Sequence, residues 1–468
     1  MDRTTRTIRR HSVPFQSIVA LLFLTLAASL HSPPAPGQDN VLTGTTSGVT
    51  SIRLAVADFK PLAAADPQIT TFKQTFDTTL YADLATAGIF DIVSKSLMPP
   101  GNPGTPSDIQ LQSYSNAPAS AAYIAFGSLG VTAGKLVVNG FLFDDKNLQY
   151  PQVIAKQYSE EASADSARQV AHRFADEIIY RLGGGVPGIA ESKIYYVKIL
   201  GPFAKEIWAM DYDGANQHAI THLGTDSISP RISPDNTRLA FASFGKYGAQ
   251  IKMYSLILDR YVNFPTGNVS SQTPAWSPDG NKLAYAAAPN GSFNIRVADS
   301  NGNLASQITS FRDASSPAYN PKTGAQIAFI SGRTGLPQLY IMNSDGTGVQ
   351  LLTNGGYASS PSWSPDGQFI AFSWERKYGP GAPGGRDIYI ISTSPGADGG
   401  YPWTQMTHDS GLCDFPSWSP DSRHIAYANT ADGRADHMRI WTILADPQNP
   451  QKRPLTGPGA DMPNWSWK

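Results

Sequence analysis

A short motif recurs through the second half of the chain and limits the folds that this half can adopt. It reads SPRISPDNTRLAFAS from Ser229, TPAWSPDGNKLAYAA from Thr273, SPAYNPKTGAQIAFIS from Ser316, SPSWSPDGQFIAFSW from Ser360 and FPSWSPDSRHIAYAN from Phe415. The leading prolines, with one more in the terminal MPNWSWK, are Pro230, Pro274, Pro317, Pro361, Pro416 and Pro463. Their spacings are 44, 43, 44, 55 and 47 residues, and a period of about 40–45 residues is typical of propeller blades. The repeat therefore predicts a β-propeller.

Each repeat divides into four predicted strands. PxWS is a short inner strand, PDG is a tight turn in which Pro fixes φ, and the alternating LAFAS-type segment is the second strand. The third strands are IWAMDYDG (Ile207), IKMYSLIL (Ile251), IRVADSNG (Ile295), LYIMNSDG (Leu339), IYIISTS (Ile388) and IWTILAD (Ile440). The fourth strands contain AITHL, FPTG, QITS, QLLT, QMTH and PLTG. Four strands make one blade.

The two ends of the repeat region are expected to join in one blade. IYYV (Ile194 to Val197) is the predicted second strand of the first blade, but no inner strand precedes it. The terminal MPNWSWK is a predicted inner strand that no second strand follows. Pairing the two closes the ring and leaves no open sheet edge. The chain is therefore predicted to be mainly β, with a six-bladed β-propeller over residues 190–468.

A small α/β domain is predicted over residues 51–182. IRLAVADF (Ile52 to Phe59) is typical of a buried strand, and a helical face follows, made of Ile69, Phe72, Phe76, Leu80 and Leu84 and ended by Gly88. After a Pro- and Gly-rich stretch with a short helix near Ile109, the segments AYIAFGSL, KLVVNGFLFD and QVIAKQYS are predicted strands. A helix over Ser163 to Leu182 stops at Gly183, and residues 183–189 are predicted to be a linker.

The first 37 residues are predicted to be a signal peptide. Four arginines in the first ten residues precede an apolar run from Ser17 to Leu30. At about 1.5 Å per residue this run spans about 21 Å, too short for a bilayer core of about 30 Å. Small residues allow cleavage after Ser29 or Gly37. The default export route is Sec, and the Arg9–Arg10 pair raises the twin-arginine route as an alternative. The chain is expected to be exported without inserting directly into a membrane.

Composition and motifs argue against several classes of function. Lys and Arg number 36 and Asp and Glu 37, so no excess of positive charge indicates nucleic-acid binding. No G-x-S-x-G or HExxH motif is present, and the single cysteine, Cys413, cannot form an internal disulfide. The repeated aspartates are better explained by turn formation than by calcium binding; they are Asp235, Asp279, Asp366 and Asp421. We therefore expect a protein that is not an enzyme and holds no cofactor or metal.

Strand polarity places the loops before each leading proline on one face of the propeller and the PDG turns on the other. The residues directly before the prolines would form a ring at one mouth of the channel: Ser229, Thr273, Ser316, Ser360, Phe415 and Met462. Ser and Thr at such positions also suit ordinary turns. As a ring, however, these residues are the best binding surface that the sequence offers.

The order of these segments resembles the TolB family of the Tol-Pal system. The resemblance covers almost all of the chain after the signal peptide, and its most specific parts are SGVTSIRLAVADF, GIAESKIYYV and WAMDYDGANQHAITH. It implies a non-enzymatic, monomeric adaptor in the periplasm. Such an adaptor bridges the inner-membrane protein TolA and the peptidoglycan-associated lipoprotein Pal, and supports envelope integrity and constriction at division.

The resemblance also implies two binding regions. A flexible tail over residues 38–50 would contact a TolA-type protein, first through Gln38, Asp39, Asn40, Val41 and Leu42. The loops before the leading prolines would contact a Pal-type lipoprotein, with Ser270, Thr273 and Ser315 the best-matched positions. NPKTG (Asn320 to Gly324), PDN and PDS depart from the repeat on the opposite face, and a Gly/Pro-rich insert at 378–385 lies on the binding face. The alternative is an exported propeller that binds or hydrolyses a small ligand or sugar in its channel.

Overall fold

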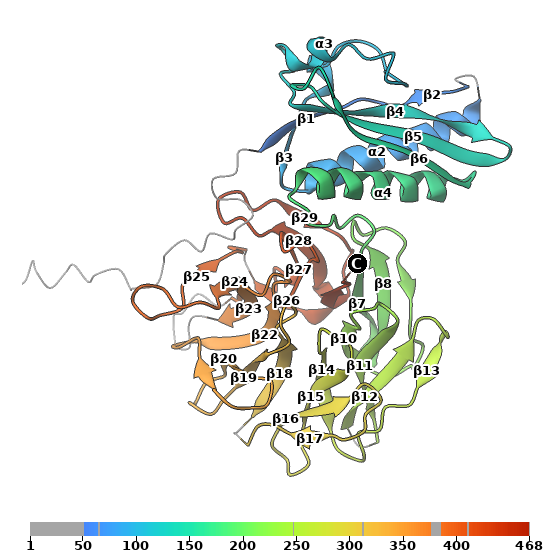
Figure 1. Cartoon of the computed structure of the whole chain (residues 1–468). Helices are drawn as coiled ribbons and strands as arrows, with labels where there is room; N and C mark the ends of the chain where they lie inside the picture. The colour runs from blue at the N-terminus through green and yellow to red at the C-terminus, as the bar shows by residue number, and fades with distance from the viewer. Residues whose placement is uncertain are drawn as a thin grey trace, which may run out of the picture.

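A computed structural model describes residues 51–63, 66–246, 248–310, 313–375, 385–409 and 411–467. Within these ranges the chain forms one mixed sheet with helices, followed by six four-stranded antiparallel sheets arranged as a propeller (Figure 1). This confirms the predicted fold class. The predicted signal peptide, the predicted tail with its five named residues, and all of the 378–385 insert except Gly385 lie outside the described residues.

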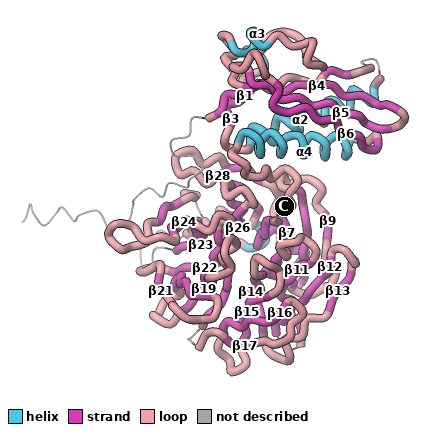
Figure 2. The backbone as a smooth tube through the Cα atoms, in the orientation of Figure 1, coloured by secondary structure: helices cyan, strands magenta, loops and turns pink. Residues whose placement is uncertain are grey.

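The α/β part is built on a six-stranded sheet in the order β3-β1-β4-β5-β6, with β2 paired to β4. β1, β3 and β4 run parallel, whereas β4, β5 and β6 form an antiparallel meander. The strands are β1 (Ile52–Val56), β2 (Lys60–Pro61), β3 (Phe90–Ile92), β4 (Tyr123–Thr132), β5 (Lys135–Asp144) and β6 (Gln152–Glu161). The helices are α2 (Pro67–Thr86), α3 (Leu111–Ser115) and α4 (Ala164–Leu182), and a 3-10 turn, η1, covers Lys95–Leu97. Figure 2 shows α2 and α4 side by side on one face of the sheet, with α3 away from them.

The two long helices, α2 and α4, each begin after a residue whose side chain caps the N-terminus. Asp66 accepts a hydrogen bond from the backbone N–H of Gln68 at 2.8 Å before α2, and Ser163 accepts one from Ser166 at 3.0 Å before α4. The predicted apolar face of α2 is buried, from Ile69 to Leu84. Gly88 ends α2 as predicted: it follows the C-cap Ala87 and has a φ of 74°. Two details differ from the sequence prediction: α3 begins after Ile109, and β3 was missed. Elements of three to five residues contain too little periodicity to predict.

The second to sixth blades follow one another in chain order, each with its inner strand first. The second blade consists of β10 (Ser227–Ile232), β11 (Arg238–Gly245), β12 (Gly248–Ser255) and β13 (Arg260–Val262), and the third of β14 (Ser271–Trp276), β15 (Lys282–Ala287), β16 (Asn294–Asp299) and β17 (Ser306–Gln307). The fourth blade consists of β18 (Ala314–Tyr319), β19 (Gln326–Ser331), β20 (Gln338–Asn343) and β21 (Gln350–Leu351), and the fifth of β22 (Tyr357–Trp363), β23 (Phe369–Glu375), β24 (Asp387–Ser392) and β25 (Trp403–Gln405). The sixth blade consists of β26 (Leu412–Trp418), β27 (His424–Thr430), β28 (Arg439–Leu444) and β29 (Lys452–Pro454). A 3-10 turn, η2 (Ala435–His437), precedes β28.

The first blade is closed by the end of the chain, as the sequence predicts. Its strands are β30 (Ala460–Trp465), β7 (Lys193–Gly201), β8 (Ala204–Asp211) and β9 (His218–Ala219). β30 pairs antiparallel to β7, with Trp465 opposite Ile194. The first strand of the propeller along the chain, β7, and the last strand, β30, are thus held together by a ladder of backbone hydrogen bonds.

The tight turns and the outer strands are only partly as predicted. In the PDG turns the aspartate holds the turn: Asp279 accepts from the hydroxyl of Ser277 at 2.5 Å and from the backbone N–H of Asn281 at 3.1 Å. The prediction that FPTG forms the fourth strand of the second blade is wrong, because the outer strand there is β13, which ends at Val262. Pro265 lacks the N–H that a ladder needs.

The α/β part rests on the first and sixth blades, on the face of the PDG turns. The imidazole of His424 lies 2.8 Å from the carbonyl oxygen of Thr86, and the guanidinium of Arg168 reaches the Asp213 carboxylate at 2.8 Å. α2 and α4 lie nearest the propeller in Figure 1. Among the described residues no helix has both the length and the apolar character needed to cross a membrane.

Candidate functional site

Every inner strand of the propeller contains a β-bulge at the leading proline. The pairing register with the second strand shifts across this point in all six blades, for example between Gln272 and Ala275 and between Ser315 and Ala318. A bulge places an extra residue on one strand and redirects its side chain. The predicted ring residues therefore lie inside the inner strands, not in loops before them.

The residue before each proline adopts a left-handed backbone conformation. The φ angles of Ser229, Thr273, Ser316, Ser360, Phe415 and Met462 lie between 48° and 55°. All six are half-buried, whereas the prolines that follow them are buried. Such backbone angles are costly for residues other than glycine, and they concentrate at functional sites. We call these six residues the bulge ring.

Side chains of the bulge ring contact their neighbours across blade boundaries. The Ser229 hydroxyl points to the Met462 sulfur at 4.0 Å, and the Thr273 hydroxyl oxygen accepts the backbone N–H of Ser316 at 3.2 Å. Since the six inner strands also contact one another around the ring, the sequence-predicted residues come together at one mouth of the channel.

Two other predicted residues lie beside the bulge ring. Ser315 directly precedes Ser316 and pairs with Ile330 across the ladder. Ser270 precedes β14, where its carbonyl oxygen accepts the backbone N–H of Ala288 at 3.0 Å. Both side chains are half-buried. They extend the surface of the bulge ring at the third and fourth blades.

Two aspartates at the same mouth were missed by the sequence reasoning. Asp414 is buried beside Arg386, and it accepts hydrogen bonds from the hydroxyls of Ser373 at 2.6 Å and Ser360 at 3.1 Å. Asp461 occupies the equivalent position in the next inner strand, and its burial together with the nearby charge of Asp414 raises its pKa to about 7. The signal was available, since both residues stand two positions before a leading proline.

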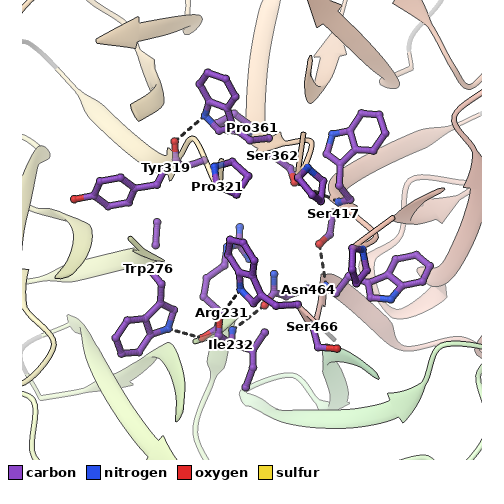
Figure 3. Close-up of a pocket in the computed structure, with 18 of the residues that line it drawn as sticks. Arg231, Ile232, Trp276, Tyr319, Pro321, Pro361, Ser362, Ser417, Asn464 and Ser466 are labelled. Atoms are coloured by element: carbon purple, nitrogen blue, oxygen red, sulfur yellow. Dashed lines mark hydrogen bonds between the residues drawn. The ribbon is translucent and has the colours of Figure 1, made fainter. Parts of the chain in front are cut away.

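The channel beyond the bulge ring is lined by the second halves of the inner strands. Figure 3 shows residues from several blades around one central space. The cavity has a volume of about 110 Å³, and its lining of proline, aromatic, Ser, Ala, Ile, Asn and Arg side chains contains no carboxylate and no histidine. Over the described part of the chain no group of three His, Cys, Asp or Glu residues is placed to hold a metal ion.

This architecture defines a class of protein: a six-bladed β-propeller, closed by its last strand, with a small α/β domain before it. Residues 180–468 match the family model described as the TolB beta propeller domain. The chain therefore belongs to this family.

Individual proteins of the family are similar to the chain over most of their length. It is 28% identical over 343 residues to the protein TolB homolog of Chlorobium luteolum, covering 72% of this chain and 74% of that protein. It is 29% identical over 389 residues to the Tol-Pal system protein TolB of Gluconobacter oxydans, covering 72% of this chain and 81% of that protein. The crystal structure of TolB from Acinetobacter baumannii shares the fold, with a TM-score of 0.70, 23% identity and coverage of 89% of this chain and 97% of that one.

Proposed function

We propose that this TolB-type propeller is a periplasmic, non-enzymatic and monomeric adaptor of the Tol-Pal system. It would be exported by its signal peptide, bind a Pal-type outer-membrane lipoprotein at the bulge ring and bind a TolA-type inner-membrane protein through the tail at residues 38–50. By linking the two membranes it would support outer-membrane integrity and constriction during division. Neither a nucleic acid nor a cofactor has a part in this proposal.

The observation that supports the proposal best is the geometry of the bulge ring. Six half-buried residues on neighbouring inner strands each lie at a bulge and before a buried proline. Rigid, partly exposed positions bind a protein with little loss of conformational entropy. Hydrolysis in the channel, the alternative function, is usually carried out by a carboxylate or a histidine that transfers a proton, and the cavity lining contains neither.

The propeller site is tested by placing a bulky charge on it. We expect Thr273→Arg and Ser315→Arg each to weaken binding of the soluble domain of a Pal-type lipoprotein by at least about tenfold, because desolvating an unpaired charge opposes binding. Isothermal titration calorimetry measures the affinity. Gln368→Arg is the matched control, since Gln368 is exposed in a PDG turn on the opposite face. If all three variants bind like the unchanged chain, the bulge ring is not the interface.

The tail is tested separately by deletion of residues 38–50 from the mature chain. We expect the shortened protein to lose affinity for a TolA-type domain while it keeps its affinity for the Pal-type domain, because the two sites would lie on different parts of the chain. Pull-down with each purified domain, followed by calorimetry, measures both. Undiminished binding of the TolA-type domain would contradict the assignment of the tail.

A further inference from the structure

The channel holds a positive charge that no acidic group of the described residues compensates. Arg231 projects from β10 into the cavity, where its guanidinium forms a single hydrogen bond within the described part of the chain, to the carbonyl oxygen of Pro230 at 2.8 Å. Among the described residues it forms no ion pair, and none of the residues that line the cavity is acidic. Burial lowers the pKa of Arg231 to about 10, which still leaves the guanidinium protonated at neutral pH. Arg231 is half-buried, and a charge that is partly removed from water is costly unless something pairs with it.

Three other polar side chains of the cavity lie at the same position of the repeat as Arg231, one residue after the leading proline. Their oxygen atoms are used as acceptors between blades. The Asn464 side-chain oxygen accepts the N–H of Ile232 at 2.8 Å, the Ser417 hydroxyl oxygen that of Trp465 at 2.9 Å, and the Ser362 hydroxyl oxygen that of Trp418 at 3.4 Å. Because a backbone N–H can only donate, these contacts fix an oxygen toward each of them.

These contacts leave hydrogen-bond donors available on the surface of the cavity. With the oxygen of Asn464 engaged, its amide NH₂ is available, and the hydroxyl protons of Ser362 and Ser417 remain to be donated. Figure 3 shows these three residues and Arg231 around the same central space. We call the four residues the donor cluster. Its one positive charge and several neutral donors complement an oxyanion.

The remaining lining is apolar. The side chains of Trp276, Trp363, Trp418, Trp465 and Trp467, of Tyr319, and of prolines from the fourth, fifth and sixth blades surround the donor cluster. An inorganic anion would make no apolar contact with these side chains, whereas the apolar part of an organic acid would pack against them. The volume of about 110 Å³ is of the order of the roughly 150 Å³ cavities that bind benzene.

We propose that the channel binds a small organic carboxylate, with the donor cluster on the carboxylate group and the tryptophan and proline side chains on its apolar body. Arg231 would supply a planar pair of N–H groups, the geometry that matches a carboxylate. This site lies beyond the bulge ring and does not depend on the proposed binding of a Pal-type lipoprotein.

The experiment uses benzoate as the probe and the full mature chain. Because five tryptophans line the cavity, we expect benzoate to change the intrinsic fluorescence in a saturable way, and calorimetry to give the same dissociation constant. Benzamide, the neutral analogue, and inorganic phosphate are each expected to bind at least tenfold more weakly. An equal affinity for phosphate would overturn the assignment to a carboxylate, and no saturable binding of benzoate would overturn the site.

Two variants test the donor cluster, and a third is the control. Arg231→Met removes the charge and Asn464→Asp keeps the acceptor for Ile232 while it adds a negative charge; both should weaken benzoate binding at least tenfold. Arg260→Met, at an exposed position of β13, should leave it unchanged. Should Arg231→Met fail to fold, as judged by circular dichroism, Asn464→Asp still decides the question. Benzoate binding that is equal in Asn464→Asp and the unchanged chain would contradict the proposal.

Discussion

Asp145 is a carboxyl group whose burial should make the stability of the whole chain depend on pH. It follows β5, its side chain is 2% exposed, and neither of its carboxylate oxygens has a hydrogen-bond partner among the described residues. Burial, with a smaller effect from the charge of Asp144, raises its pKa to about 7. Between about pH 4 and pH 7 the folded chain holds a proton here that the unfolded chain has lost. The contribution of Asp145 to the free energy of unfolding therefore falls as the pH rises, by up to about 1.4 kcal/mol per pH unit.

We predict that Asp145→Asn removes this dependence. Relative to the unchanged chain, the variant should gain at least about 1 kcal/mol of unfolding free energy between pH 5 and pH 8, as measured by urea denaturation at both values. Asp299→Asn is the control, because backbone hydrogen bonds from Asn303 and Asn301 lower the pKa of the half-buried Asp299, so this carboxyl is ionised in both the folded and the unfolded chain from pH 5 to pH 8 and its replacement should leave the difference between the two pH values unchanged. A gain of the same sign and size in both variants would refute the assignment to Asp145.

For the inner strands, the sequence predicts some features of the structure and not others. Their number, order and closure by β30 could be predicted, because a fixed period and a WS motif at the end of the chain require a partner strand near Ile194. Their bulges could not. A residue before proline is usually restricted to extended backbone, so nothing in the sequence indicates that Thr273 has a φ of 50°. That angle depends on pairing with β15, which a local pattern does not describe.

The candidate site could be predicted in position but not in contacts. The residues of the bulge ring were identified by their place before the prolines, and the structure brings them together. The partners of Asp414 come from other strands: Ser373 lies in β23, and Arg386 directly precedes β24. Separations of this kind leave no periodic signal. The sequence does offer one indication of these aspartates. Asp414 and Asp461 are charged at a repeat position that is uncharged in the other four blades.

At the scale of the whole molecule, the two parts of the chain are joined by a buried polar cluster. Asp83 of α2 accepts a hydrogen bond from the Tyr212 hydroxyl of the first blade and lies 2.7 Å from the His172 imidazole of α4. The Tyr212 and His172 rings meet edge to face at a centroid distance of 5.9 Å. Because Asp83 and His172 belong to one part and Tyr212 to the other, this cluster fixes how the α/β part sits on the propeller.

We predict that Tyr212→Phe loosens this junction. Removing the hydroxyl leaves a buried carboxylate short of one donor, so the free energy of unfolding should fall by about 2 kcal/mol. Hydrogen exchange in α2 and α4 should become faster, while exchange in the strands of the fourth blade, far from the junction, should not change. Urea denaturation and exchange detected by mass spectrometry measure the two effects.

Tyr254→Phe supplies the matched control, because it deletes the same hydroxyl from an exposed pair: Tyr254 donates to Asp259 at 2.6 Å on the surface. Water replaces the lost partner there, so the expected loss is below about 0.5 kcal/mol. Equal losses in the two variants would mean that burial of the Tyr212 contact contributes nothing. A large loss of unfolding free energy for Tyr212→Phe, with unchanged hydrogen exchange in α2 and α4, would contradict the prediction. It would mean that the Tyr212 contact stabilises the first blade and not the junction.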